Sequence, residues 1–265
     1  MLGIVLNGGI TINSNSPKDW PTYFMNSADC TILISTSPIP SHPDTAMIDE
    51  VVASARFHLP ESPIVIMADG IWSKLAHRRE QYEEYLRRLK NRYPNTTLTS
   101  FSSHSSQAKM TRTVLDANIV KTRYIMFNEH DIPLRTDIKI HWNDIFEVLQ
   151  AGRADIIRLC GFGEGIHPEH MYLTYGKVVY NQSSFWQTHQ WSQWPHLSTK
   201  ETYKQILGRY FDYDEVQMIE EKMHSICQSV KGGWIRIWQY ELPAEDKRCF
   251  THLKGRGSDP CHWEY

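Results

Sequence analysis

The first half of the chain alternates between short apolar runs and amphipathic stretches. Residues 31–35 form a β-branched apolar run that ends before Pro38, which is typical of a strand buried on both faces. A helix is expected over 44–57, where apolar residues share one face and Asp44 is the expected N-cap. The same unit recurs at 64–67 with 73–91, and at 97–101 with 107–118. Strands that alternate with helices predict a mostly parallel sheet with right-handed crossovers.

A fourth strand, residues 124–127, runs directly into the polar sequence Asn128-Glu129-His130-Asp131. The pattern beyond it predicts helices at 142–151, 199–210 and 214–229, strands at 155–159 and 234–238, and loops with further strands at 162–184. An aromatic segment covers 185–197. We therefore expect an irregular N-terminal arm over 1–28 and a single α/β domain over 29–265.

Composition removes several classes of function. The 28 Lys and Arg nearly balance the 30 Asp and Glu, for a net charge of -2, so the chain lacks the basic field typical of nucleic-acid binding. No apolar window approaches the ~20 residues that cross a bilayer, which leaves only peripheral membrane attachment open. The five widely spaced cysteines form no C-x-x-C pair and favour a reducing compartment, and the first residues lack a signal-peptide pattern. We therefore expect a cytoplasmic protein.

Polar residues follow the expected strands at 35–37, 69, 102–104 and 129–131. The carboxyl ends of parallel strands meet at one edge of a sheet, and ligands bind there. A carboxylate at the end of a buried strand, such as Asp131, is costly unless it accepts hydrogen bonds or binds a cation. A Mg²⁺ or Mn²⁺ ion that also binds a nucleotide diphosphate needs few protein ligands, and Glu129 with Asp131 would suffice. The alternative is that both carboxylates only cap a turn before Pro133.

Three segments resemble family-2-like glycosyltransferases of the GT-A fold, among them sugar transferases of bacteria and large algal viruses. They are 127–134 (FNEHDIPL), 190–197 (QWSQWPHL) and 218–224 (MIEEKMH), and the likeness extends from Thr31 to Arg256. The resemblance implies a Rossmann-like central sheet flanked by helices, with a nucleotide-binding half over about 29–135 and a smaller acceptor half over about 136–265. It also implies that Glu129-His130-Asp131 replaces the usual Asp-x-Asp motif, which binds the metal and the diphosphate.

The same resemblance implies a set of donor contacts. Thr36 and Ser37, in the loop after the first strand, would touch the base and ribose, and Asp69 would accept from the ring N–H of a uracil or similar base. Lys109 and Arg112, at the start of a helix, would contact the base or a phosphate. Each assignment has a structural alternative, because Asp-Gly is a common turn pair and the two cations could belong to a solvated helix face.

The resemblance further implies a catalytic base and a C-terminal metal ligand. Glu220 and Glu221 match an acidic pair at the start of a helix beside the acceptor, and one of them would take the acceptor hydroxyl proton, with a slight preference for Glu221. Both could instead only favour the helix dipole. His252 would be a further metal ligand, and Lys254 and Arg256 would neutralise the leaving diphosphate, although a lone His is more often structural.

The aromatic segment combines ring faces with amide and imidazole edges, which suits a sugar ring but is also ordinary core material. Its candidate substrate-binding residues are Trp186, His189, Gln190, Trp191, Trp194 and His196.

These observations predict an enzyme that transfers a sugar from a nucleotide-sugar, with a UDP-sugar favoured, to a glycan, glycolipid or glycoprotein, and inverts the anomeric centre with a carboxylate base and Mn²⁺ or Mg²⁺. One alternative is a nucleotidyltransferase on a similar sheet, although residues 36–40 lack the Gly-rich basic loop of that class. The other is a non-catalytic protein that binds carbohydrate or nucleotide.

Overall fold

The computed structural model describes residues 26–160, 172–229, 234–242 and 248–253. The strands are β1 (Cys30–Thr36), β2 (Ile64–Ala68), β3 (Thr97–Ser100), β4 (Tyr124–Glu129), β5 (Ile156–Leu159), β6 (Thr174–Tyr180), β7 (Ser183–Thr188), β8 (His196–Thr199) and β9 (Ile237–Glu241). The helices are η1 (Ser27–Asp29), α1 (Ala46–His58), η2 (Ser73–Arg78), α2 (Arg79–Arg92), α3 (Ser106–Asp116), α4 (Trp142–Gln150), α5 (Lys200–Tyr210) and α6 (Ile219–Ser229). Most of the expected N-terminal arm, and both Lys254 and Arg256, lie outside the described residues.

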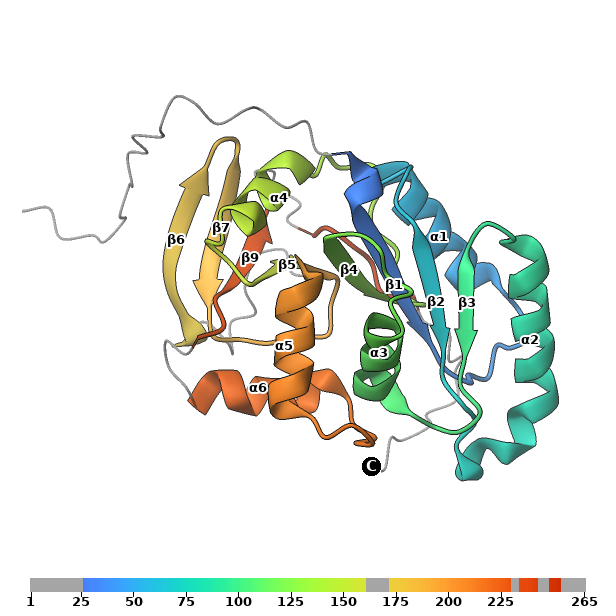
Figure 1. Ribbon diagram of the computed structural model, residues 1–265. Coiled ribbons are helices and arrows are strands. Elements are labelled where there is room, and N and C mark those ends of the chain that lie inside the picture. The colour runs from blue at the N-terminus through green and yellow to red at the C-terminus, as the bar shows by residue number, and fades with distance from the viewer. Residues whose placement is uncertain (1–25, 161–171, 230–233, 243–247, 254–265) are drawn as a thin grey trace, which may run out of the picture.

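The described strands form one sheet in the order β3-β2-β1-β4-β8-β5-β9-β7-β6 (Figure 1). β3, β2, β1 and β4 are parallel neighbours, as the alternation of strands and helices predicts. β8 runs antiparallel between β4 and β5, β9 is parallel to β5, and β7 and β6 form an antiparallel hairpin at the far edge. The expected α/β fold is confirmed, and the β-sandwich of many carbohydrate-binding modules is excluded.

Helices cover both faces of the sheet, and its first strands are therefore apolar on both sides (Figure 1). α1, α2 and α4 pack on one face, where Val51 and Tyr85 contribute to the core. α3, α5 and α6 pack on the other face, where Val114 and Tyr203 are buried. This packing leaves the carboxyl ends of the parallel strands as the edge at which polar side chains can meet a ligand.

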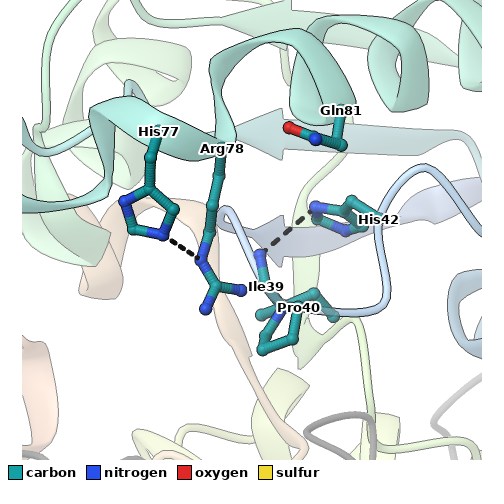
Figure 2. A pocket seen from close by; sticks show the side chains of 6 residues that line it. All are labelled: Ile39, Pro40, His42, His77, Arg78 and Gln81. Carbon is teal, nitrogen blue, oxygen red and sulfur yellow. Dashed lines mark hydrogen bonds between the residues drawn. The ribbon is translucent and has the colours of Figure 1, made fainter.

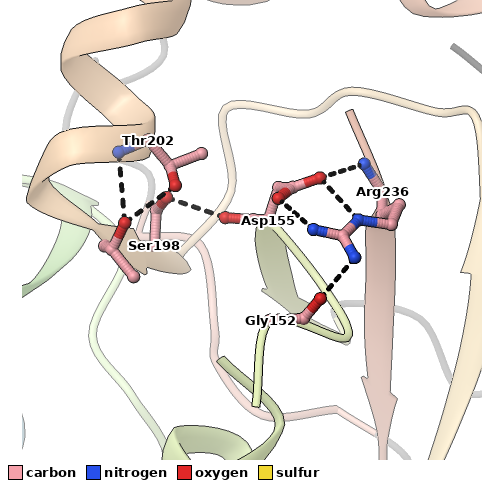
Figure 3. Close-up of polar contacts among 6 residues, drawn as sticks. Gly152, Asp155, Ser198, Thr202 and Arg236 are labelled. Atoms are coloured by element: carbon pink, nitrogen blue, oxygen red, sulfur yellow. Dashed lines mark hydrogen bonds and ion pairs between the residues drawn. The ribbon is translucent and has the colours of Figure 1, made fainter. Parts of the chain in front are cut away.

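Asp155 joins the amino ends of β5 and β9 to β8 (Figure 3). The Arg236 guanidinium donates to both Asp155 carboxylate oxygens, with Nε at 3.0 Å and Nη2 at 2.8 Å, and it also bonds the Gly152 carbonyl. Ser198 donates its hydroxyl to the Asp155 carbonyl at 2.7 Å. The network fixes the register of the second half of the sheet at the edge opposite the carboxyl ends.

Two sequence expectations need correction. The helix expected over 73–91 is divided into η2 and α2, with Leu75 outside helical geometry at φ -104° and ψ 16°. The segment 185–197 contains most of β7 and the start of β8, and β8 is an additional strand within the sheet. The pattern missed β8 because four residues, of which only Leu197 is aliphatic, give no readable period. No helix in the described part is long and apolar enough to cross a membrane.

Candidate functional site

The registers of β1 with β2 and β4 bring Thr36, Asp69 and Glu129 to the same edge of the sheet. Thr36 is buried, and its hydroxyl lies 3.2 Å from the Tyr85 hydroxyl of α2. Ser37, the next residue, is partly exposed. The backbone of this loop is therefore fixed by packing against α2, while Ser37 keeps access to solvent.

A pocket of about 280 Å³ lies beside this edge, between the loop after β1 and the η2 and α2 helices (Figure 2). It is lined by Ile39, Pro40, His42, His77, Arg78 and Gln81. The His42 ring stacks on Tyr85 with centroids 3.8 Å apart. Burial, followed by the nearby charges of His130 and Arg78, lowers the pKa of His42 to about 3, so this ring is neutral at pH 7. The pocket thus combines a neutral aromatic ring with the Arg78 cation, a combination suited to a nucleoside and its phosphate.

Asp69 holds the loop between β3 and α3. Its carboxylate accepts from the backbone N–H groups of Gly70 at 2.8 Å, Ser105 at 2.7 Å and Ser106 at 3.3 Å. His104 Nδ1 donates to the same carboxylate at 2.7 Å, and this bond raises the pKa of His104. Both carboxylate oxygens therefore already accept hydrogen bonds inside the protein, and contact with a base stays a prediction.

Glu129 ends β4 beside α3. Gln107 of α3 donates from Nε2 to Glu129 Oε1 at 2.5 Å. Burial, followed by the charge of Asp131, raises the pKa of Glu129 to about 8, and the charge of Glu220 acts in the same direction. Three carboxylates thus interact at this end of β4, and such a cluster gains from a bound cation.

The C-terminal segment brings His252 to Asp131. Phe250 pairs with Leu134 in an antiparallel bridge, and the Leu253 N–H donates to the Asp131 carbonyl at 2.8 Å. His252 Nε2 consequently lies 3.4 Å from Asp131 Oδ2. Burial alone would raise the pKa of Asp131, but the His252 bond and the nearby imidazole charges hold it below the ordinary value. Backbone hydrogen bonds between the C-terminal segment and the segment after β4 therefore bring Asp131 and His252 together.

The chemistry of these side chains fits a divalent cation, because carboxylates and imidazole are ligands that Mn²⁺ accepts. Among the described residues, no three His, Cys, Asp or Glu side chains converge on one point as a complete metal cluster. Asp131 and His252 form a close pair, and Glu129 is their electrostatic neighbour. Such a partial set suits an ion whose remaining ligands are phosphate oxygens and water.

The two candidate bases occupy different environments at the start of α6. Glu220 is half-buried, and its charge acts on both Glu129 and Arg158. Glu221 is exposed. Because neighbours on a helix point about 100° apart, only one of them can face the cluster at β4. This placement favours Glu220, whereas the resemblance carried a slight preference for Glu221, and the identity of the base stays a prediction.

Lys109 and Arg112 contact the connection between α5 and α6. Lys109 Nζ lies 2.9 Å from Asp214 Oδ1, and Arg112 donates to the Phe211 carbonyl at 2.9 Å. The Arg112 guanidinium also lies over the Tyr213 ring, 5.2 Å from its centroid. Both cations thus hold the segment that leads into α6, and their contact with a donor stays a prediction.

The aromatic segment is distributed over several environments. Trp191 and His196 are buried in the core beneath α5, where the His196 ring stacks on Tyr203 at 5.6 Å. Trp194 packs against Phe250 at 5.4 Å between centroids. The other members face the β6 and β7 hairpin or β5: His189 stacks on Tyr175 at 4.4 Å, Trp186 lies under Lys177, and Gln190 accepts from Arg158. The side chains of this segment therefore lie in different parts of the protein, and their contact with a sugar stays a prediction.

Sequence reasoning missed Gln107 and Arg158. Gln107 follows the loop that Asp69 holds, so only the fold brings it to Glu129. Arg158 stands within an apolar strand, and its charge in that position was a readable signal.

No family model matches the chain, and no curated protein does. Solved structures do match. GalNAc-T7 with UDP, GalNAc and Mn²⁺ has a TM-score of 0.54 at 9% identity over 87% of this chain. Residues 1–349 of S. aureus TarS match with a TM-score of 0.49 at 13% identity over 85% of this chain. The mannosyltransferase PcManGT from Pyrobaculum calidifontis, with GDP-Man and Mn²⁺, matches with a TM-score of 0.49 at 10% identity over 79% of this chain. The chain spans 44%, 60% and 53% of the lengths of these three structures. The match to GalNAc-T7, together with the order of the strands in the sheet, identifies a GT-A-type fold.

Proposed function

We propose that the chain is a glycosyltransferase that moves a sugar from a nucleotide-sugar donor, with a UDP-sugar favoured, to a carbohydrate-containing acceptor. The observation that carries this proposal is the pair of Asp131 and His252, beside Glu129, at the carboxyl end of β4. GalNAc-T7, which has a similar fold, was solved with UDP, GalNAc and Mn²⁺. In this chain, the pocket lined by His42 and Arg78 would bind the nucleoside of the donor.

Asp131 and His252, with Glu129, would hold Mn²⁺ or Mg²⁺ together with the donor diphosphate. The ion would supply positive charge that neutralises the diphosphate as it leaves. Glu129 must lose its proton to bind a cation, because burial and the charge of Asp131 raise its pKa to about 8. Ion binding should therefore release a proton below this pH.

Glu220 would act as the general base of an inverting transfer. Its carboxylate takes the proton of the acceptor hydroxyl, and the acceptor oxygen forms a bond to the anomeric carbon of the sugar. The bond from that carbon to the diphosphate oxygen breaks, and the nucleoside diphosphate leaves with the electron pair. The exposed Glu221 has no part in this step.

Calorimetric titration of UDP, GDP and dTDP, first with Mn²⁺ and then with EDTA, tests the donor site. We expect Mn²⁺-dependent binding of one nucleotide that is lost in Asp131→Ala. Asp137→Ala is the matched control, because Asp137 is an exposed carboxylate paired with Arg135. Equal nucleotide binding by wild type and Asp131→Ala would refute the donor site.

Transfer assays of Glu220→Gln and Glu221→Gln test the catalytic base. We expect Glu220→Gln to lose at least about two orders of magnitude in kcat while nucleotide affinity is unchanged, and Glu221→Gln to keep nearly full activity. The reverse ranking would move the base to Glu221. Release of pyrophosphate from a nucleoside triphosphate and a sugar phosphate would instead identify a nucleotidyltransferase.

A further inference from the structure

A row of polar side chains crosses the second half of the sheet on the face covered by α5. Arg158 of β5 is in register with His196 of β8 on one side and with Gln239 of β9 on the other. Gln239 is in register with Trp186 of β7. Partners in register point to the same face, and His196 stacks on Tyr203 of α5. Arg158, Gln239 and Trp186 are therefore adjacent on that face.

Within the described part of the chain, three hydrogen-bond donors in this row have no acceptor. Arg158 and Gln239 are each 1% exposed. Arg158 uses only Nη1, which donates to the Gln190 carbonyl at 2.9 Å and to Gln190 Oε1 at 3.0 Å. Arg158 Nε, Gln239 Nε2 and Trp186 Nε1 are all buried without a partner. Buried donors are nearly always bonded in native proteins, so three orphans in one row indicate a missing acceptor.

The Arg158 charge also has no counter-ion in the part of the chain that the structure describes. Among the described residues, no Asp or Glu forms an ion pair with Arg158. Burial lowers the pKa of Arg158 to about 10, which still leaves the guanidinium charged at pH 7, and the charge of Glu220 acts in the opposite direction. A buried charge without a partner destabilises the folded state, so its retention points to an anion supplied from outside. The Gln193 side chain, 3% exposed, also has no partner for either of its polar atoms.

We propose that Arg158, Gln239 and Trp186 form a subsite for the carboxylate of an acidic sugar, such as a hexuronic acid. A carboxylate offers two coplanar acceptor oxygens, which match a guanidinium fork and a neighbouring amide N–H. A neutral hydroxyl would leave the charge of Arg158 unpaired. This assignment rests on the proposed function, because it takes the bound molecule to be a saccharide, in the donor or in the acceptor.

The test is calorimetric titration of the full chain with methyl glucuronoside, methyl glucoside and inorganic phosphate, without metal or nucleotide. We expect the glucuronoside to bind on the order of tenfold tighter than the glucoside. Arg158→Gln should lose the preference. Arg87→Gln is the control, because Arg87 is an exposed arginine of α2 that pairs with Glu84. Equal affinity for both sugars, a preference retained in Arg158→Gln, or tighter binding of phosphate would each overturn the subsite.

If Arg158→Gln does not fold, Gln239→Leu and Trp186→Phe provide a second test, because each removes one donor and keeps most of the side-chain volume. Each should weaken glucuronoside binding several-fold, and no change in either would overturn the subsite.

Titration of UDP-glucuronate and of UDP-glucose, each with Mn²⁺, then distinguishes the donor from the acceptor as the source of the carboxylate. A preference for UDP-glucuronate that is lost in Arg158→Gln identifies the donor. Independent binding of UDP and of the glucuronoside to the same protein identifies the acceptor. Loss of nucleotide binding would refute the proposed function alone, since the glucuronoside test needs neither metal nor nucleotide.

Discussion

Replacement of Asp69 by alanine should destabilise the protein strongly, because one carboxylate organises the whole loop before α3. The substitution removes the acceptor of three backbone N–H groups, of which Ser105 at 2.7 Å and Gly70 at 2.8 Å make the short bonds. Asp69 is 4% exposed, so water cannot readily replace the carboxylate. With about 1 to 3 kcal/mol for each buried donor left unpaired, and the two short bonds dominant, the free energy of unfolding should fall by about 3 kcal/mol.

Urea unfolding followed by circular dichroism measures this loss. Asp69→Asn keeps one carbonyl oxygen for the backbone donors, so it should lose roughly half as much as Asp69→Ala. Asp137→Ala provides the control, since its exposed ion pair with Arg135 should contribute little to stability. A free energy of unfolding for Asp69→Ala within about 1 kcal/mol of the wild-type value would refute the structural role. Loss of nucleotide affinity without loss of stability would instead support direct contact between Asp69 and the nucleotide base.

Three further changes test other parts of the fold. Burial lowers the pKa of His196 to about 4, so folded stability should fall as the pH drops from 6.5 toward 4, and His196→Gln should reduce that slope by up to about 1.4 kcal/mol per pH unit in urea titrations. The Cys160 and Cys249 sulfurs are 3.2 Å apart, so oxidation by diamide should cross-link them, and peptide mass spectrometry after alkylation should find the joined pair. Gly70→Ala would place Cβ 2.1 Å from the Ser103 backbone carbon and should lower soluble expression and the melting temperature, whereas unchanged melting would contradict the close approach.

The sequence predicted the first half of the sheet well because each strand is a continuous apolar run. β1, β2 and β4 are buried along nearly their whole length, and helices with one apolar face separate them. The sequence also located the acidic residues at the end of β4, since a carboxylate after a buried strand is visible without a structure. It could not predict β8 or the close approach of the Cys160 and Cys249 sulfurs, because both depend on how distant segments meet.

The site itself was predictable only in part. Resemblance suggested His252 as a partner of Asp131, and the structure supplies the physical cause, which is the pairing of Phe250 with Leu134. The choice between Glu220 and Glu221 needed the orientation of α6, which a sequence pattern does not give. Spacing alone also could not show that Lys109 is paired with Asp214.

The inserted strand β8 sets the dimensions of the site. Neighbouring strands lie about 4.8 Å apart, so β8 separates β4 from β5 by about 10 Å. Glu129 ends β4 on one side of this gap, Arg158 projects from β5 on the other, and the charge of Glu220 acts on both. A donor diphosphate at β4 and an anionic sugar group at β5 would therefore bind at separate points, with the base near both.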